Sequence, residues 1–315
     1  MIREKKRKKA SNFTRRFLAV VRYELLWNIR KKKFLGMIVV AFALATIALV
    51  VPVILSNVRN EPIVQNPNQA VSTGVGIGGL GFFLFAVVTA MNSISGEFES
   101  GSIVPLLTKP VSRTMIFLGK TLASFLILLT TYTILLCYLA IGSIAIYGPQ
   151  SNLHLLSLSL IGSIISTFIW IAMILAIGTI SKSSMIAALG AFGIFMGLTI
   201  ASFAVSVATE QAGVLDYLPG NGASGYIGPI ENHTSVSTGA NSIASNLVTY
   251  VLNPSVNVTY IKISSSPSPP YYHETLLYTE PLSLVLARSI IVAAVYIVFF
   301  MFISWFALKR AEVLE

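Results

Sequence analysis

The chain has 315 residues, of which 55% are hydrophobic and 11% are charged, and its mean hydropathy is +0.78. Polar side chains could not cover that much apolar surface in water, so the composition excludes an ordinary soluble protein and indicates a membrane protein. The net charge of +10 does not indicate nucleic-acid binding, because it is concentrated in an N-terminal arm beside an apolar segment.

Six segments of the chain are long and apolar enough to cross a membrane as helices. A transmembrane helix needs roughly 20 mostly apolar residues to cross a hydrocarbon layer of ~30 Å. The sequence therefore predicts an all-α membrane protein with six transmembrane helices. The predicted spans are residues 34–55, 75–94, 121–146, 155–180, 185–207 and 284–308.

The N-terminal arm, residues 1–33, carries 13 lysines and arginines. We expect it to contact anionic lipid headgroups, where each basic residue contributes about 1 kcal/mol. The alternative is that its charge only fixes the orientation of the first span. Residues 17–30 mix apolar side chains with arginines, which predicts a helix lying in the membrane interface. The lysines at 31–33 favour a break after this helix over a cytoplasmic extension of the first span.

The first span itself is too long for the apolar part of a signal peptide, so we expect it to stay as an anchor. The second and fifth spans are rich in glycine. Gly74 and Gly78, and likewise Gly193 and Gly197, stand four residues apart, a spacing that lets helix backbones approach closely in membranes. This pattern favours helix packing, within or between subunits, over a substrate lining.

The connector between the second and third spans, residues 95–120, is charged and rich in turn-forming residues. Placing it in hydrocarbon would cost roughly 3 kcal/mol for each charge, so we place it in water. We expect a short helix after Gly96, and Lys109-Pro110 predicts an extended link before the next helix opens at Arg113. The charged residues of the connector are Glu97, Glu99, Lys109, Arg113 and Lys120.

No motif in the chain indicates catalysis, so we expect no enzyme activity. Gly119-Lys120-Thr121 resembles the end of a phosphate-binding loop, but that motif requires a glycine where this chain has Thr114. We therefore expect no ATP site and no cofactor in this chain.

The cysteine and histidine residues do not form a metal-binding pattern. The single cysteine, Cys137, lies in the third span and is expected to be a small buried apolar residue. His154, His233 and His273 fall in loops, where ordinary surface histidines are expected rather than a shared metal site.

A long segment, residues 208–281, separates the fifth and sixth spans and is rich in serine, asparagine, glycine and tyrosine. Asn232 and Asn257 begin Asn-X-Thr sequons and are glycosylation candidates. Within the segment we expect a short amphipathic helix at 240–252 and a strand at 255–263. We favour a glycosylated, partly ordered cap over a substrate gate or a dock for another protein.

Charged residues are nearly absent from the predicted spans. Spans one to five contain none, and Arg288, near one end of the sixth span, is expected to extend its side chain to the headgroups. Intramembrane charges usually mark an ion or proton path, so their scarcity disfavours a channel or a secondary transporter. A channel of this topology, or an accessory or scaffold membrane protein, stays as an alternative.

Nineteen of the 22 lysines and arginines fall on one predicted side of the membrane. Basic residues stay on the cytoplasmic side, which predicts that both termini are cytoplasmic and that 208–281 lies outside. The predicted order is a basic arm with an interfacial helix (1–33), five spans with the connector (34–207), the extracytoplasmic cap (208–281), the sixth span (282–308) and a cytoplasmic tail (309–315).

The connector carries a family resemblance. Residues 95–113, SGEFESGSIVPLLTKPVSR, followed by Leu118-Gly119-Lys120, closely resemble the connector between the second and third spans of ABC-2 type permeases. In that family it has an acidic pair, a Gly-Ser or Gly-Thr, an apolar Leu-Leu, a Pro-Val-Ser-Arg turn and a Leu-Gly-Lys. The similarity is closest to the NosY-like branch, and the six spans, the basic interfacial helix and an outer insertion before the last span support it.

The resemblance implies the membrane-spanning subunit of an ATP-driven exporter in the cell membrane, with a coupling helix in the connector that contacts a separate ATPase. ATP and Mg²⁺ would bind that ATPase, because the tail after the last span is too short for an ATPase domain. The other implied partners are membrane lipids and either a second permease copy or a paralogue. No nucleic acid is expected as a partner. The residues assigned to ATPase coupling are Gly96, Glu97, Phe98, Glu99, Gly101, Pro105, Lys109, Pro110, Arg113 and Lys120.

Overall fold

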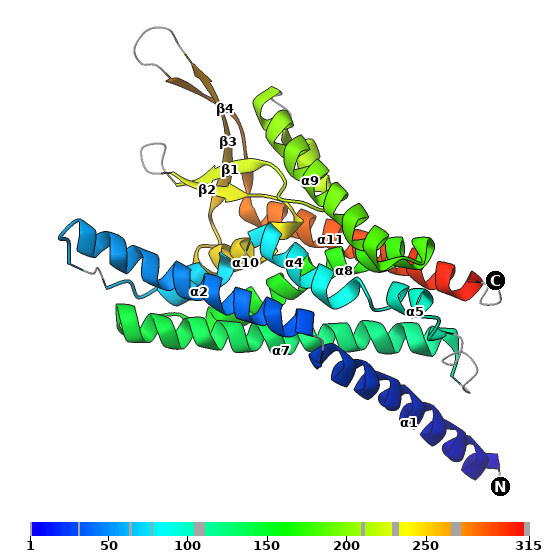
Figure 1. Ribbon diagram of the computed structural model, residues 1–315. Helices are drawn as coiled ribbons and strands as arrows, with labels where there is room; N and C mark the ends of the chain where they lie inside the picture. Colours follow the sequence, from blue (N-terminus) through cyan, green and yellow to red (C-terminus); the bar gives the residue numbers. More distant parts are fainter. Residues whose placement is uncertain are drawn as a thin grey trace.

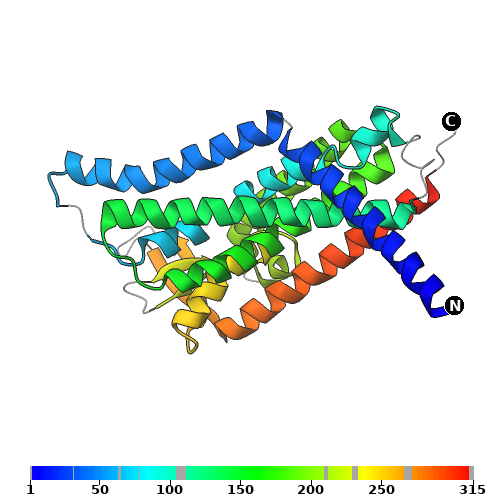
Figure 2. The same cartoon turned by 90° about the horizontal axis from the view of Figure 1, so that it is seen from below.

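The computed structural model describes residues 2–30, 32–62, 65–76, 78–103, 111–208, 212–228, 233–265 and 272–311. Figure 1 shows an elongated bundle of helices with a small β-sheet at one end. Both chain termini lie at the other end of the bundle (Figures 1 and 2). We call these ends the cap end and the terminus end.

The prediction of six membrane-spanning helices is confirmed. Within the described residues, six helical segments are long and apolar enough to cross a membrane. They are preceded by α1 (Ile2–Ile29), which runs obliquely to α7 in Figure 2. The spanning helices are α2 (Lys32–Val58), α4 (Gly78–Ala90) together with α5 (Ser95–Glu99), α7 (Arg113–Tyr147), α8 (Leu156–Ser181), α9 (Ser184–Ala208) and α11 (Leu282–Arg310).

The third spanning helix opens at Arg113, as predicted, although the apolar span was placed only from residue 121. Ser112 has an extended backbone, and its side-chain oxygen accepts a hydrogen bond from the Met115 amide at 3.1 Å, so it caps the helix at that point. Helix α7 runs without a break from Arg113 to Tyr147. Lys120, which we expected in water, therefore lies inside a continuous helix.

The second span begins later than predicted, because the glycine-rich segment breaks the helix. A separate short helix, α3 (Gln69–Val75), precedes it, and Gly78 has a φ of +65°, which favours glycine. Gly74 and Gly78 therefore lie on different helices and do not form the packing face that we expected. Gly193 and Gly197 share one helix, α9, and an added Cβ at either would meet no atom within 4 Å.

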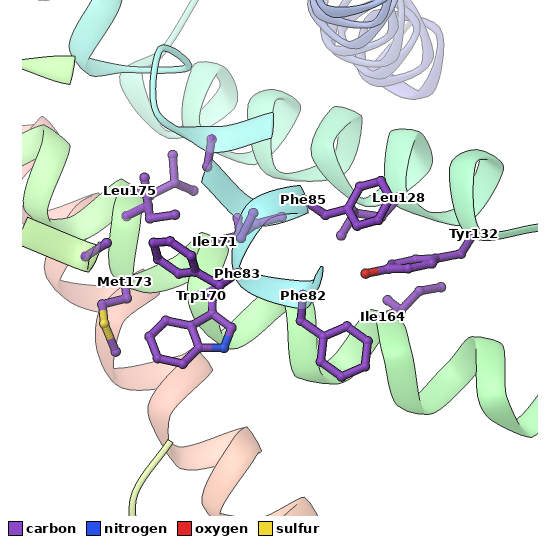
Figure 3. Packing of buried hydrophobic residues seen from close by; sticks show 14 of the residues in the cluster. Phe82, Phe83, Phe85, Leu128, Tyr132, Ile164, Trp170, Ile171, Met173 and Leu175 are labelled. Atoms are coloured by element: carbon purple, nitrogen blue, oxygen red, sulfur yellow. The ribbon is translucent and has the colours of Figure 1, made fainter. Parts of the chain in front are cut away.

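Helix α8 is the centre of the bundle, and its sequence explains why. Its residues are apolar or small on every face, as expected for a helix surrounded by other helices. Trp170, Ile171 and Ile174 are fully buried. Figure 3 shows Phe83 of α4 beside Trp170, where the two rings meet edge to face with centroids 5.6 Å apart.

The segment between the fifth and sixth spans folds into a compact cap. The expected helix is present as α10 (Ile243–Leu252), and the expected strand belongs to a four-stranded antiparallel sheet of order β2-β1-β3-β4. Its hairpin register pairs Tyr260 with Tyr278, and a bulge follows at Ile261. The strands are β1 (Ser224–Ile227), β2 (Thr234–Ser237), β3 (Asn257–Ser265) and β4 (Tyr272–Pro281).

The cap is inserted into the bundle rather than resting on it. An added Cβ at Gly162 of α8 would lie 2.4 Å from the Ala244 Cα of α10, so only glycine permits this contact. The Trp170 indole donates a hydrogen bond to the Asn241 side chain at 3.2 Å, and the Ser166 hydroxyl donates to the Ala240 carbonyl at 2.8 Å. The cap therefore completes the core at this end of the bundle.

Candidate functional site at the connector between the second and third spans

The connector lies at the terminus end, where it forms the short helix α5 that the sequence predicted. Gly101 ends this helix with a φ of +67°, and an added Cβ there would meet no other atom, so the backbone conformation alone favours glycine. Pro105, Lys109 and Pro110 lie outside the described residues.

A buried ion cluster joins α1, α5 and α7 at this end. The Lys120 ammonium donates to Oε1 of Glu24 at 2.6 Å and to Oε1 of Glu97 at 2.8 Å. Lys120 is 2% exposed, Glu24 3% and Glu97 9%, so these charges are removed from water and depend on one another. With one lysine and two carboxylates, the cluster has a formal charge of −1.

Gly119 brings α1 close enough to make this cluster. An added Cβ at Gly119 would lie 2.7 Å from Cγ1 of Val20, and something would have to shift. The Gly119-Lys120 pair therefore has a structural role. The absence of a side chain at Gly119 lets α1 approach α7, and Lys120 then pairs with Glu24 of α1.

Glu99 connects the connector to the fifth span. Its Oε1 accepts hydrogen bonds from the Ser184 amide at 2.7 Å and from the Ser183 hydroxyl at 3.0 Å, and its Oε2 accepts from the Ser184 hydroxyl. These bonds place a carboxylate at the N-terminus of α9, where it meets the positive end of the helix dipole. The neighbouring Phe98 ring lies 5.9 Å from the Lys182 ammonium.

Arg113 connects the connector to the sixth span. One nitrogen of its guanidinium, Nη1, lies 3.1 Å from the carbonyl oxygen of Leu308, 2.9 Å from that of Lys309 and 2.7 Å from that of Ala311. These are the carbonyls that the end of α11 leaves without helical partners, so Arg113 caps that helix.

We use the name hub for Glu24, Glu97, Glu99, Arg113 and Lys120. The last four belong to the set that the sequence assigned to coupling. Glu97 and Lys120 are buried and Arg113 is half-buried, whereas Glu99 is exposed together with Ser100, Gly101 and Ser102, which follow it. The hub therefore fixes the connector to α1, α9 and α11 and leaves a short turn facing outward.

Glu24 is a functional residue that we did not predict. It is the only acidic residue of α1 after Glu4, and it stands four and three residues after the apolar Val20 and Val21, which places it on their side of the helix. An acidic side chain on the apolar side of a basic helix indicates a buried partner, and this signal would have identified it.

A second ion cluster lies at the cap end, and it corrects the expectation for Arg288. Nη2 of Arg288 donates to Oδ2 of Asp216 at 2.5 Å and to Oε1 of Glu280 at 2.7 Å, and Nη1 donates to Oε2 of Glu280 at 3.1 Å. The side chain pairs within the protein because two carboxylates from the cap reach it, so it does not extend to the headgroups. We call Asp216, Glu280 and Arg288 the clamp.

The clamp carboxylates have further donors. Oδ1 of the fully buried Asp216 accepts from the Ala223 amide at 2.9 Å and from the Thr238 hydroxyl. The Tyr260 hydroxyl donates to Oε1 of Glu280 at 2.6 Å, and burial raises the pKa of Tyr260, so this phenol stays protonated. The clamp ties the cap to the first turns of α11.

Other residues singled out in the sequence lie apart from both clusters. Asn257, a glycosylation candidate, is exposed at the start of β3, and Asn232 lies outside the described residues. Cys137 is exposed on α7 rather than buried as expected. His233 stacks edge to face on Tyr226. Among the described residues, no three histidine, cysteine, aspartate or glutamate side chains are grouped to hold a metal ion.

Comparison with protein families gives a match over most of the chain. The family described as ABC-2 family transporter protein has a model that matches residues 18–313, which include the hub, the spanning helices and the cap. No curated protein matches the chain.

Proposed function

The chain belongs to the ABC-2 transporter family. We propose that it is a membrane permease subunit whose hub transmits movements of a separate ABC ATPase to the spanning helices. The observation that carries this proposal is the set of contacts that the connector makes. Helix α5 contacts α9 through Glu99, and the first turns of α7 contact α1 through Lys120 and α11 through Arg113. Because Glu97 of α5 also pairs with Lys120, a displacement of α5 and the start of α7 acts on three helices at once.

The exposed turn, residues 100–102, is the part of the described connector that we assign to the ATPase contact. The residues before it hold it in position, Glu97 through the buried Lys120 and Glu99 through Ser183 and Ser184. Replacing both glutamates by alanine would disturb Lys120 and the cap of α9, so we expect that variant to destabilise the fold. We therefore propose that Glu97 positions the turn rather than contacting the ATPase.

The rest of the proposal follows from the family and from the charge pattern. Both termini are cytoplasmic, the cap is extracytoplasmic in a cell membrane, and ATP and Mg²⁺ bind the partner ATPase. A second permease copy or a paralogue completes the assembly, and export is the direction. Membership of the NosY-like branch and glycosylation at Asn232 and Asn257 are further parts of the proposal, supported only by the sequence motifs.

The test is purification in mild detergent followed by mass spectrometry. The unmodified chain should bring down an ATPase with Walker motifs, and Ser100→Arg with Ser102→Arg should lose it, because two bulky charges enter the turn. Ser151→Arg, at an exposed serine of the cap end, is the matched control and should retain the ATPase. An accessory protein or a channel would bring down no ATPase. Retention by the double variant would reject the assignment of the turn.

A further inference from the structure

Helix α1 has two faces with different chemistry. The face against α7 buries Val21, Glu24 and Asn28, which are spaced by three and four residues. This face carries the Glu24 carboxylate to Lys120, and it is held close to α7 by the Gly119–Val20 contact.

The opposite face is exposed and combines arginines with large apolar side chains. Arg15 and Arg22 are exposed, as are Leu18 (58%), Leu26 (44%) and Ile29 (51%). These residues follow one another at steps of three or four, so they form one stripe along the helix. Such a stripe fits a membrane surface, since apolar side chains enter the acyl boundary while arginines bind phosphate groups.

The positive charge of α1 favours anionic lipids over zwitterionic ones. Residues 3–9 hold six lysines and arginines against one glutamate, so the N-terminal part adds to the positive charge of the stripe. Attraction of this kind acts on anionic headgroups and not on zwitterionic ones. Figures 1 and 2 show α1 running obliquely away from the bundle at the terminus end, where its N-terminal part extends beyond the other described helices.

The two faces are mechanically linked, because α1 is one helix from Ile2 to Ile29. We propose that anionic lipid headgroups bind the exposed stripe of α1 and thereby hold Glu24 on Lys120, so that the lipid charge of the membrane sets the position of the connector. Lipid can act in this way only by binding α1 more tightly in its docked position than in a displaced one. The proposal rests on the proposed function only where it extends to ATP hydrolysis.

The first experiment needs the permease alone. Hydrogen exchange is followed in nanodiscs of phosphatidylcholine, with or without phosphatidylglycerol. We expect phosphatidylglycerol to slow exchange across residues 15–29 and 95–103 by roughly tenfold, as an attraction of this order implies. Arg15→Gln with Arg22→Gln should lose the response in both segments. Arg59→Gln, an exposed arginine beyond the end of α2, is the control and should keep it.

A second pair of variants tests the linkage. Glu24→Gln should keep the lipid response of residues 15–29 and lose that of 95–103. If Glu24→Gln does not fold, Gly119→Ala, which displaces Val20, serves the same purpose. The proposal would be overturned if phosphatidylglycerol did not change hydrogen exchange in α1, or if the arginine variant kept the full lipid response. It would also be overturned if residues 95–103 still responded to lipid in both Glu24→Gln and Gly119→Ala.

The third experiment separates this proposal from the function proposed above. Phosphatidylglycerol should stimulate ATP hydrolysis by the purified complex, and the arginine variant should lose the stimulation. If exchange responds to lipid but no ATPase is found, the proposed function fails and the lipid surface stands. If α1 is protected by the ATPase in phosphatidylcholine alone, the stripe belongs to that protein, and the lipid proposal fails.

Discussion

The hub and the clamp both hold charged side chains away from water, and they differ in how completely their carboxylates are hydrogen-bonded. In the clamp, and around Lys120 in the hub, one cation lies between two carboxylates with a formal charge of −1. In the clamp, Asp216 and Glu280 accept hydrogen bonds from cap groups as well as from Arg288, and, in the part of the chain that the structure describes, the buried atom without a partner is Nε of the arginine. In the hub, a carboxylate oxygen, Oε2 of Glu24, is buried with no hydrogen-bond partner among the described residues.

Arg288 of the clamp and Lys120 of the hub also differ in geometry. Arg288 presents a planar fork that fixes two carboxylates in a defined geometry, whereas Lys120 is a point charge on a flexible chain. Carboxylates that accept several fixed hydrogen bonds resist rearrangement, whereas a carboxylate with one unpaired oxygen loses less when its partner moves. From this comparison we expect the clamp to rearrange less readily than the hub.

The largest effect is expected from Lys120→Met. This change leaves the buried carboxylate of Glu24 without the hydrogen bond that Lys120 donates to it, at a cost of about 3–5 kcal/mol in the free energy of unfolding. The measurement is unfolding in mixed micelles. Adding Glu24→Gln and Glu97→Gln to the variant should recover most of the loss. A small loss for Lys120→Met would show that the hub charges reach water.

Arg288→Met should have a smaller effect, of about 2–3 kcal/mol, because Asp216 and Glu280 keep their other donors. The same unfolding measurement applies, with Arg59→Met as the exposed control. If this variant is less stable than Lys120→Met, the comparison between the clusters is reversed, and the additional donors do not protect the clamp.

The smallest effect is expected from Tyr260→Phe, which removes a single donor from the clamp and keeps the ring. The hydroxyl bond to Glu280 is worth about 1 kcal/mol to stability. The loss should shrink in the Arg288→Met, Glu280→Gln background, where the carboxylate is gone. An equal loss in both backgrounds would show that Tyr260 stabilises the cap by packing alone.

Much of the fold could be predicted, because membrane spans are set by long-range composition. A run of about 20 apolar residues is stable mainly as a helix across the membrane, so α8, α9 and α11 were predicted with small boundary errors. The second and third spans were less accurate, because their ends depend on single residues. The φ of Gly78 and the cap made by Ser112 decided where those helices begin.

The site was only partly predictable, for a physical reason. The sequence identified the connector by its charges, but hydropathy treats every charge as seeking water. Lys120 is buried and Arg288 is half-buried because carboxylates distant in the sequence reach them, 96 and 72 residues away for Glu24 and Asp216. Pairing of this kind depends on the folded geometry and leaves only weak local signals, such as the position of Glu24 on α1.

The insertion of α10 against Gly162 has a consequence for the order in which the chain is assembled. Chains fold progressively as they are synthesised, and α8 is made before the cap. The Ser166 hydroxyl and the Trp170 indole find their partners at Ala240 and Asn241 only after that later segment has been synthesised. Until then these two polar groups of α8 lack the partners that they have in the folded chain, so the packing of α8 is completed only when residues 240–244 dock against it.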